Sequence, residues 1–208
     1  NNYNYNRIST NTRVNDYYYY SYKIIAGTNT IIDKLKPGEN VVNDQLLAEN
    51  LYIRSLMYFY LANIFGRPYN QGAATNLAVP LKLKDDPFEN LPRNTVKEVY
   101  DQIISDLLKA ESLFNNDSRK KIFASKDAVN ALLARIYLYI GDNAKAKDYA
   151  DKVITSGKFS LIAKDKYSEL ATGVPENNPE NIFSIRFVKD LDNQGSGSIG
   201  SMYATING

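Results

Sequence analysis

The chain has 208 residues, 44% of them hydrophobic, which predicts one compact domain, or two small ones on a shared helical framework, and excludes a disordered chain. Its 25 Lys and Arg and 23 Asp and Glu leave a formal net charge of +2, too weak a field to favour nucleic acid as a partner. The absence of Cys and His excludes thiolate and imidazole metal sites, Cys nucleophiles and Ser-His pairs, so we expect no metal, no cofactor and no catalytic residue.

The N-terminal part of the chain predicts a helix after an Asn- and Tyr-rich start. That start lacks the pattern of a signal peptide, so we expect it to be the interior of a longer precursor. Tyr17 to Tyr20 allow two interpretations, ligand stacking or core packing, and core packing is favoured because half of any helical turn faces inward. The helix should end before Lys36-Pro37-Gly38. Its expected buried stripe comprises Tyr17, Tyr20, Ile24, Ile31 and Leu35.

Two longer helices are expected next. The first runs from about Asp44 to Phe65 and ends at Gly66, and its two adjacent apolar stripes predict burial on two sides. These stripes are Leu47, Leu51, Tyr58, Leu61 and Phe65, and beside them Ala48, Tyr52, Ser55, Phe59 and Ala62. The second begins at a capping box formed by Thr95 and Glu98. Its core stripe is Tyr100, Ile103, Leu107, Ala110 and Phe114.

Residues Ser125 to Gly157 predict a helical hairpin of the tetratricopeptide (TPR) type. Ser125 caps the first helix, Gly141 makes the turn, and Gly157 ends the second helix. Small residues at Ala134 and Ala146 allow the two helices to approach closely. Leu133 and Tyr137 complete the match to the TPR template. One such repeat cannot bury its own face, so the helices from Asp44 to Phe65 and from Thr95 to Phe114 are its expected neighbours.

The pattern changes after Gly157. Phe159 to Ile162 is a short apolar run, and Phe183, Ile185 and Phe187 alternate with polar residues, which predicts a half-buried strand. The fold class is therefore mostly α, with TPR-like hairpins packed as an α-α superhelix and a short β element near the C-terminal end. We expect one domain over 1–208: a helical scaffold over 12–157, short strands and loops over 158–190, and a flexible tail over 191–208.

Charged residues offer weak candidates for chemistry. Asp85, Asp86 and Glu89 are expected to be solvated loop charges, although a glycosidase would need two facing carboxylates. Arg54 and Arg135 lie in mid-helix near apolar stripes. We expect them to form partly buried ion pairs, with acids such as Glu49 or Asp106 as partners.

The loop from Gly66 to Pro80 is the predicted ligand site. It is long for a connection between helices, and long loops in compact domains are often functional. Tyr69, Asn70 and Gln71, with Asn76 nearby, supply an aromatic face for stacking on a sugar or peptide, and amides for directional hydrogen bonds. The alternative is an ordinary ordered loop.

Several ordered motifs together resemble the SusD/RagB family of outer-membrane nutrient-binding lipoproteins from Bacteroidetes. The resemblance covers about Tyr17 to Val188. Its motifs are Ala48-Glu49 with Ile53-Arg54-Ser55-Leu56-Met57-Tyr58-Phe59, Phe65-Gly66-Arg67-Pro68-Tyr69 leading to Val79-Pro80-Leu81, Pro92-Arg93-Asn94-Thr95-Val96-Lys97-Glu98-Val99-Tyr100 with Ile104-Ser105-Asp106-Leu107, Ala131-Leu132-Leu133-Ala134-Arg135-Ile136-Tyr137-Leu138-Tyr139, Ala150-Asp151-Lys152-Val153-Ile154 with Ser156-Gly157, and Glu180-Asn181-Ile182-Phe183.

This resemblance implies a function that composition does not show. It implies capture of oligosaccharides, or in some members peptides, at the cell surface and their delivery to a TonB-dependent SusC-like transporter. It also implies an outer-membrane location with a lipid anchor in the full precursor. Family members are longer and carry an amino-terminal lipidated Cys that is not in this chain, which fits a processed or truncated form. The alternative function is a TPR-like scaffold that binds only proteins.

Overall fold

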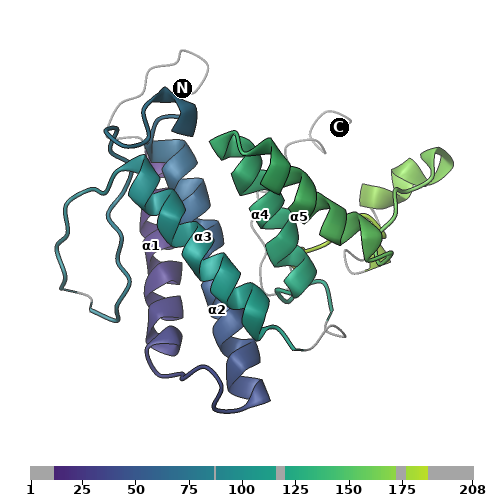
Figure 1. Ribbon diagram of the computed structural model, residues 1–208, viewed down its shortest axis with the longest axis horizontal. Helices are drawn as coiled ribbons and strands as arrows, with labels where there is room; N and C mark the ends of the chain where they lie inside the picture. The colour runs from purple at the N-terminus through teal and green to yellow at the C-terminus, as the bar shows by residue number, and fades with distance from the viewer. Residues whose placement is uncertain (1–11, 87, 116–119, 172–176, 187–208) are drawn as a thin grey trace, which may run out of the picture.

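The computed structural model describes residues 12–86, 88–115, 120–171 and 177–186. Within these ranges the chain forms five α-helices (Figure 1): α1 (Thr12–Ile32), α2 (Val41–Phe65), α3 (Val96–Leu113), α4 (Lys126–Ile140) and α5 (Asn143–Thr155). Two short 3-10 segments, η2 (Tyr69–Gln71) and η3 (Lys164–Ala171), lie in the connections.

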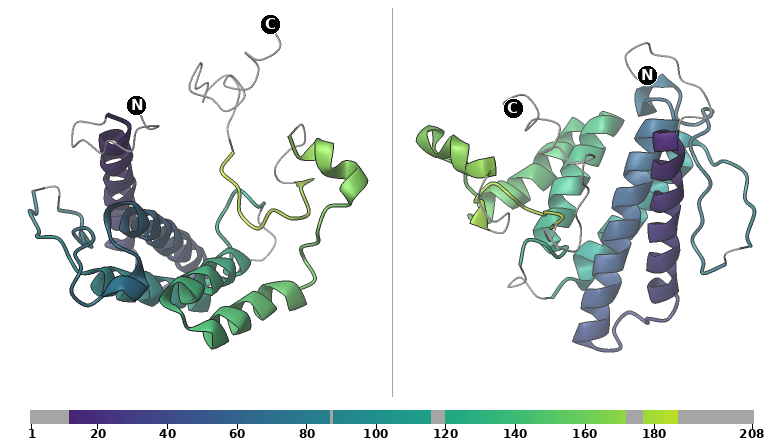
Figure 2. Two further views of the ribbon diagram at one scale, coloured as in Figure 1. Left: turned by 90° about the horizontal axis from the view of Figure 1, so that it is seen from above. Right: turned by 180° about the vertical axis from the view of Figure 1, so that it is seen from behind.

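The helices pack in chain order along a curve. α2 contacts both α1 and α3, α3 contacts α4, and α4 contacts α5. Seen from above, they follow an arc, and the segment 177–186 lies on its concave side (Figure 2). This arrangement places α1 and residues 177–186 on the two flanks of a shared concave face.

α2 forms the centre of the core, as its two apolar stripes predicted. Among its residues, Tyr58, Leu61 and Ala48 are at most 1% exposed. The predicted stripe of α3 is buried too, from Tyr100 to Ala110. Burying apolar surface on both sides of one central helix is the main stabilising contribution in such a layer.

Local signals at the helix ends are confirmed. Thr95 and Glu98 form the capping box of α3, and the Ser125 hydroxyl accepts the Ala128 N–H at the start of α4. Gly141 takes a left-handed conformation with φ of +91° between α4 and α5, and Gly157 has φ of +67° after α5. The hairpin is therefore present with its predicted limits, because these signals depend only on neighbouring residues.

The predicted buried face of α1 is wrong. Tyr17, Tyr20, Ile24 and Ile31 are all more than one-third exposed, whereas the buried residues are Ser21, Ile25, Thr28 and Asn29. The reason is that α1 packs through hydrogen bonds as well as apolar contact. The Asn29 side-chain amide donates to the carbonyls of Lys82 and Lys84, and the Tyr22 hydroxyl donates to the Pro80 carbonyl at 2.6 Å.

The predicted strand near the C-terminal end is not found in the described part of the chain. Residues 159–162 and 182–186 form no strand there, and Phe187 lies outside the described residues, as does the expected tail over 191–208. The β pairing recorded among the described residues is one isolated bridge between Leu77 and Thr95. Alternation along a chain predicts a strand only where a neighbouring edge can pair with it.

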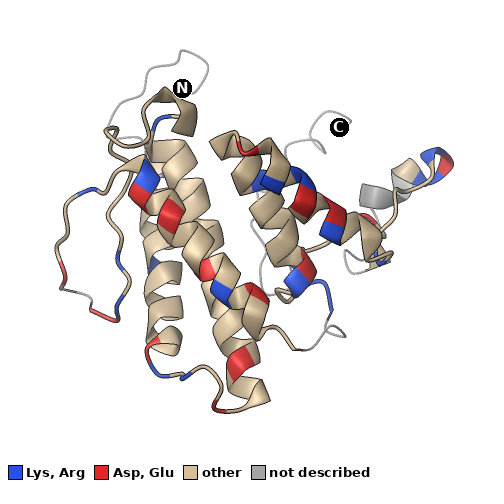
Figure 3. Cartoon of the chain, in the orientation of Figure 1, with Lys and Arg blue, Asp and Glu red and all other residues tan. Residues whose placement is uncertain are grey.

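Charges are mixed over the surface. Figure 3 shows Lys and Arg interleaved with Asp and Glu along α3 and α5, whereas α1 and α2 carry few charges in this view. No helix of the described residues is both long and apolar enough to cross a bilayer. The described residues also contain no group of three or more acidic side chains placed to hold a metal ion.

Candidate functional site

The predicted ligand loop from Gly66 to Pro80 is an ordered element anchored to α3. The backbone N–H groups of Val96 and Lys97 donate to the carbonyls of Asn76 and Ala73 at 2.8 and 2.9 Å. The Arg93 guanidinium donates to three carbonyls, of Phe65, Leu77 and Ala78. These bonds satisfy the hydrogen-bonding groups of the backbone in a long connection, and they fix its path.

The three predicted site residues of this loop have different surroundings. Tyr69 is half-buried, and its ring centroid lies 5.1 Å from that of Tyr100. Asn70 and Gln71 are exposed. The Asn76 amide donates to the Gln71 carbonyl at 2.6 Å, so it stabilises the loop instead of facing a ligand.

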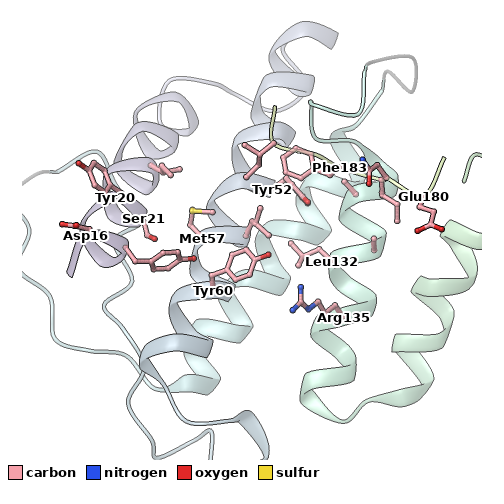
Figure 4. Close-up of a pocket in the computed structure, with 18 of the residues that line it drawn as sticks. Asp16, Tyr20, Ser21, Tyr52, Met57, Tyr60, Leu132, Arg135, Glu180 and Phe183 are labelled. Carbon is pink, nitrogen blue, oxygen red and sulfur yellow. The ribbon is translucent and has the colours of Figure 1, made fainter. Parts of the chain in front are cut away.

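A larger site lies on the concave face, in an open groove of about 950 Å³ (Figure 4). Its walls come from α1, α2, α4 and residues 180–185. Aromatic side chains gather in it, with Tyr17 and Tyr20 from α1, Tyr52 and Tyr60 from α2, and Phe183 from the C-terminal wall. Aliphatic residues such as Leu56, Met57, Ala128 and Leu132 form most of the remainder, and the charged residues are Arg13, Asp16, Arg135 and Glu180.

The C-terminal wall of the groove is attached at specific points. The ring of Phe183 packs edge-on against Tyr52 with 5.3 Å between centroids. The Ser184 N–H donates to the Lys121 carbonyl at 2.9 Å, and the Lys121 ammonium donates to the Asn178 carbonyl at 2.7 Å. The alternating residues that predicted a strand therefore supply one wall of the groove.

Two tyrosines of the groove, Tyr17 and Tyr52, are neutral hydrogen-bonding groups. Burial raises the pKa of Tyr17, partly opposed by a hydrogen bond to Ser21, and burial also raises the pKa of Tyr52. At neutral pH both hydroxyls can donate and accept hydrogen bonds. A flat ring with a hydroxyl at its edge suits a sugar, which presents an apolar face and polar rim.

Arg54 and Arg135 differ in their partners. Arg54 forms the predicted buried ion pair with Asp106, with Nε to Oδ2 at 2.8 Å. The prediction for Arg135 is wrong: it is exposed, its Cζ lies 5.4 Å from the centre of the Phe59 ring, and Nη2 donates to the Tyr139 hydroxyl at 3.5 Å. Arg135 lies on the face of α4 that lines the groove, where tyrosines from α2 and α4 surround it instead of acids.

Aromatic contacts connect the predicted loop with the groove. The ring of Tyr69 packs on Tyr100, Tyr100 on Phe59, and Phe59 on Tyr139, with centroid distances of 5.1, 6.0 and 5.3 Å. Tyr139 then contacts Arg135 at the groove. A series of packed aromatic rings thus connects the two candidate regions through the core.

A second cavity, of about 550 Å³, lies on another flank of α1 against residues 80–86. Its apolar lining comes from Tyr18, Tyr19 and Tyr22, and Lys and Asp side chains form its rim. Asp85 and Asp86 are exposed there, which agrees with the expectation that they are solvated charges in a loop.

Sequence reasoning missed the groove because it assigned its aromatic residues to the core. Tyr17, Tyr20 and Tyr52 lie on the predicted apolar stripes, and a stripe does not distinguish burial from the lining of a groove. Tyr60 belongs to neither predicted stripe of its helix. One signal was available. Four consecutive tyrosines, from Tyr17 to Tyr20, span a whole helical turn, so some of them must be exposed.

Comparison with known proteins gives a consistent result. A SusD-like family model, described as starch-binding and associating with the outer membrane, matches residues 1–138. SusD-like protein P2 from Formosa agariphila is 28% identical over 193 residues, which cover 90% of this chain and 36% of that protein. The chain therefore spans little more than a third of the length of this curated relative.

Solved structures agree with that match. A SusD superfamily protein from Bacteroides thetaiotaomicron superimposes with a TM-score of 0.73 and 28% identity, over 87% of this chain and 40% of that one. A laminarin-binding SusD-like protein gives a TM-score of 0.63 and 27% identity, over 80% and 36% of the two chains. Since the family model covers residues 1–138 of the 208, well over half, the chain belongs to the SusD-like family.

Proposed function

We propose that this chain contributes a carbohydrate-binding groove to an outer-membrane nutrient-binding protein. The observation that carries the proposal is the gathering of Tyr17, Tyr20 and Tyr60 with Arg135 and Asp16 in one open groove. Tyrosine rings stack on the apolar faces of sugars, while charged and hydroxyl groups bond to sugar hydroxyls. The description of the matching family and the laminarin-binding relative support a saccharide as the ligand.

The predicted loop extends this proposal. Asn70 and Gln71 are exposed beside Tyr69, and the aromatic contacts from Tyr69 through Tyr100 lead toward the groove. We place an oligosaccharide in the groove, with these two amides bonding to the end of a longer ligand. The role is binding, with no catalytic step.

The finer parts of the function rest on the family resemblance. The protein would be exposed at the cell surface, lipid-anchored in its full precursor, and would pass its oligosaccharide to a TonB-dependent SusC-like transporter. Peptides are the second ligand class that the resemblance allows, and a peptide panel beside the saccharide panel separates the two.

Isothermal titration of the whole protein against laminarin and malto-oligosaccharides tests the proposal. Tyr20→Ala should weaken saccharide binding about twofold to tenfold, because one ring stack is worth about 0.5–1.5 kcal/mol. Tyr167→Ala is the matched control, since Tyr167 is 65% exposed, close to the 58% of Tyr20, and lies outside the groove. Flat titrations with every saccharide, or equal effects of the two variants, would refute the groove as a sugar site.

A TPR-like scaffold that binds only proteins is the second candidate function. It is favoured by exposed apolar side chains on the hairpin, Leu138 at 60% and Ile154 at 72%. Co-purification with a SusC-like transporter that is lost in Leu138→Glu or Ile154→Glu, together with no saccharide binding, would support the scaffold over the carbohydrate-binding groove.

A further inference from the structure

Aromatic rings hold the guanidinium of Arg135 in place at the groove. Its Cζ lies 5.4 Å from the ring centre of Phe59 and 5.6 Å from that of Tyr139, and Nη2 reaches the Tyr139 hydroxyl at 3.5 Å. Phe59 is itself 1% exposed and belongs to the core. In Figure 4 the Arg135 side chain points from α4 toward Tyr60 on α2. A cation over Phe59, a ring that is fixed by the core, is positioned before any ligand arrives.

No carboxylate in the described part of the chain forms an ion pair with Arg135. The groups that act on it are hydroxyls: a hydrogen bond to Tyr139 raises the pKa of Arg135, burial opposes this, and Tyr60 adds to the increase. Arg54 provides the contrast, because its guanidinium is fully engaged by Asp106 and Asn29.

The two carboxylates of the groove lie elsewhere. Asp16 belongs to α1, and Figure 4 shows it on the wall opposite Arg135. The Glu180 carboxylate accepts the Ile162 N–H at 2.8 Å, so one of its oxygens is bound to the segment that follows α5. The end of the groove near Arg135 therefore offers a cation that lies among tyrosines and forms no ion pair with a carboxylate of the described residues.

A guanidinium with free N–H groups fits planar oxyanions better than it fits neutral hydroxyls, because it donates two parallel charged hydrogen bonds. We propose that the saccharide bound in the groove carries an oxyanion, a carboxylate or a sulfate ester, and that Arg135 binds this group while Tyr60 and Tyr139 keep the guanidinium in place. The inference rests on the proposed carbohydrate-binding function and specifies its ligand class.

The test compares three tetrasaccharides of equal length by isothermal titration with the whole protein at low ionic strength. The probes are a neutral β-glucan tetrasaccharide, a tetrauronate and a sulfated galactan tetrasaccharide. The expected result is that one or both anionic probes bind at least tenfold more tightly than the neutral probe. The anionic probe that binds more tightly shows whether the oxyanion recognised by Arg135 is a carboxylate or a sulfate ester. Adding 0.5 M salt should reduce this preference, since the charge pair is partly exposed to solvent.

Variants assign the preference to one side chain. Arg135→Gln should weaken binding of the anionic probes much more than binding of the neutral probe, so that the anionic preference is lost, and Arg135→Lys should restore part of that preference, as expected for a charge without the forked geometry. Lys109→Gln removes the same charge from the exposed surface of α3, outside the groove, and should change nothing. Thermal unfolding of each variant checks that the fold is retained.

The possible outcomes separate the oxyanion inference from the carbohydrate-binding proposal on which it rests. Binding of all three probes without preference, or a preference that survives Arg135→Gln, overturns the inference and leaves the carbohydrate-binding proposal standing. Absence of binding to every saccharide overturns both.

Discussion

Arg54 and Asp106 form a two-pronged ion pair between α2 and α3, with Nε to Oδ2 at 2.8 Å and Nη2 to Oδ1 at 2.9 Å. Both side chains are only 6% exposed. Nη1 of Arg54 also donates to the Asn29 side chain on α1, and the Gln102 amide donates to Asp106. One buried network therefore connects α1, α2 and α3, and two of these helices, α1 and α2, form walls of the groove.

Replacing Arg54 by Met should destabilise the protein by about 3–5 kcal/mol. The physical reason is that the Asp106 carboxylate would remain buried without its partner charge, which costs more than the pair itself contributes. Denaturant unfolding followed by circular dichroism measures the change.

The double variant Arg54→Met with Asp106→Leu is the control for that prediction. It removes both charges and should recover most of the lost stability, because an apolar pair of similar volume can replace a buried ion pair. Additive losses in the double variant would show that the contacts of each residue elsewhere, and not the charge pair, determine stability.

Two Gly→Ala substitutions should change the stability of the folded protein in opposite directions. Gly141 has φ of +91°, so Ala there should destabilise the hairpin by about 1–2 kcal/mol. Gly27 lies inside α1, and a Cβ atom added to it would meet nothing within 4 Å, so Ala should stabilise the helix by about 0.5–1 kcal/mol. Thermal unfolding should place the two midpoints on opposite sides of the parent protein. A lower midpoint for Gly27→Ala would show that the exposed face of α1 is covered in solution.

Replacing Phe183 by Ala should release the C-terminal wall of the groove. The substitution removes the edge-on contact with Tyr52, whereas the remaining polar contacts, such as the Ser184 to Lys121 hydrogen bond, should not hold the wall by themselves. Hydrogen exchange should become faster in residues 180–186 and stay slow in α2 and α3. Unchanged protection of this segment would mean that its backbone bonds are sufficient.

The capping box of α3 predicts a pH dependence of stability. Hydrogen bonds from the Thr95 backbone N–H and hydroxyl to the carboxylate hold the pKa of Glu98 below its ordinary value. Because the folded pKa is lower than the unfolded one, this contribution is complete above about pH 4.3 and is lost as the pH falls through the folded pKa. The stability difference between the parent and Glu98→Gln should therefore be largest near neutral pH and shrink below pH 4. A difference that does not vary with pH would contradict this assignment.

The structural features that could be predicted from the sequence are those determined by residues close together along the chain. Thr95 with Glu98, Ser125, Gly141 and Gly157 each set a helix end through contacts within a few residues, and all are found where expected. The core of α2 was also predictable, since apolar residues on two stripes have to be covered on two sides.

The features that sequence could not predict depend on distant partners. The orientation of α1 follows from Asn29 reaching carbonyls 53 and 55 residues away, which no periodicity encodes. Arg135 has the same sequence context as Arg54, namely a mid-helix position beside apolar stripes. The difference is that Asp106 faces Arg54 while tyrosines face Arg135, and only the fold decides this.

The attachment of residues 80–84 has a consequence for how this stretch can vary. Side chains of Tyr22, Tyr58, Asn29 and Arg54 bond to the carbonyls of four of its five residues, and the Tyr58 hydroxyl also accepts the Lys82 N–H. All these bonds end on backbone atoms, so the identity of the Lys82 and Lys84 side chains matters little, whereas Leu81 and Leu83 pack against the core. The length of the stretch matters much more, because inserting or deleting one residue would displace every carbonyl from its partner at once. We therefore expect this segment to accept substitutions at Lys82 and Lys84 readily and to reject changes in length.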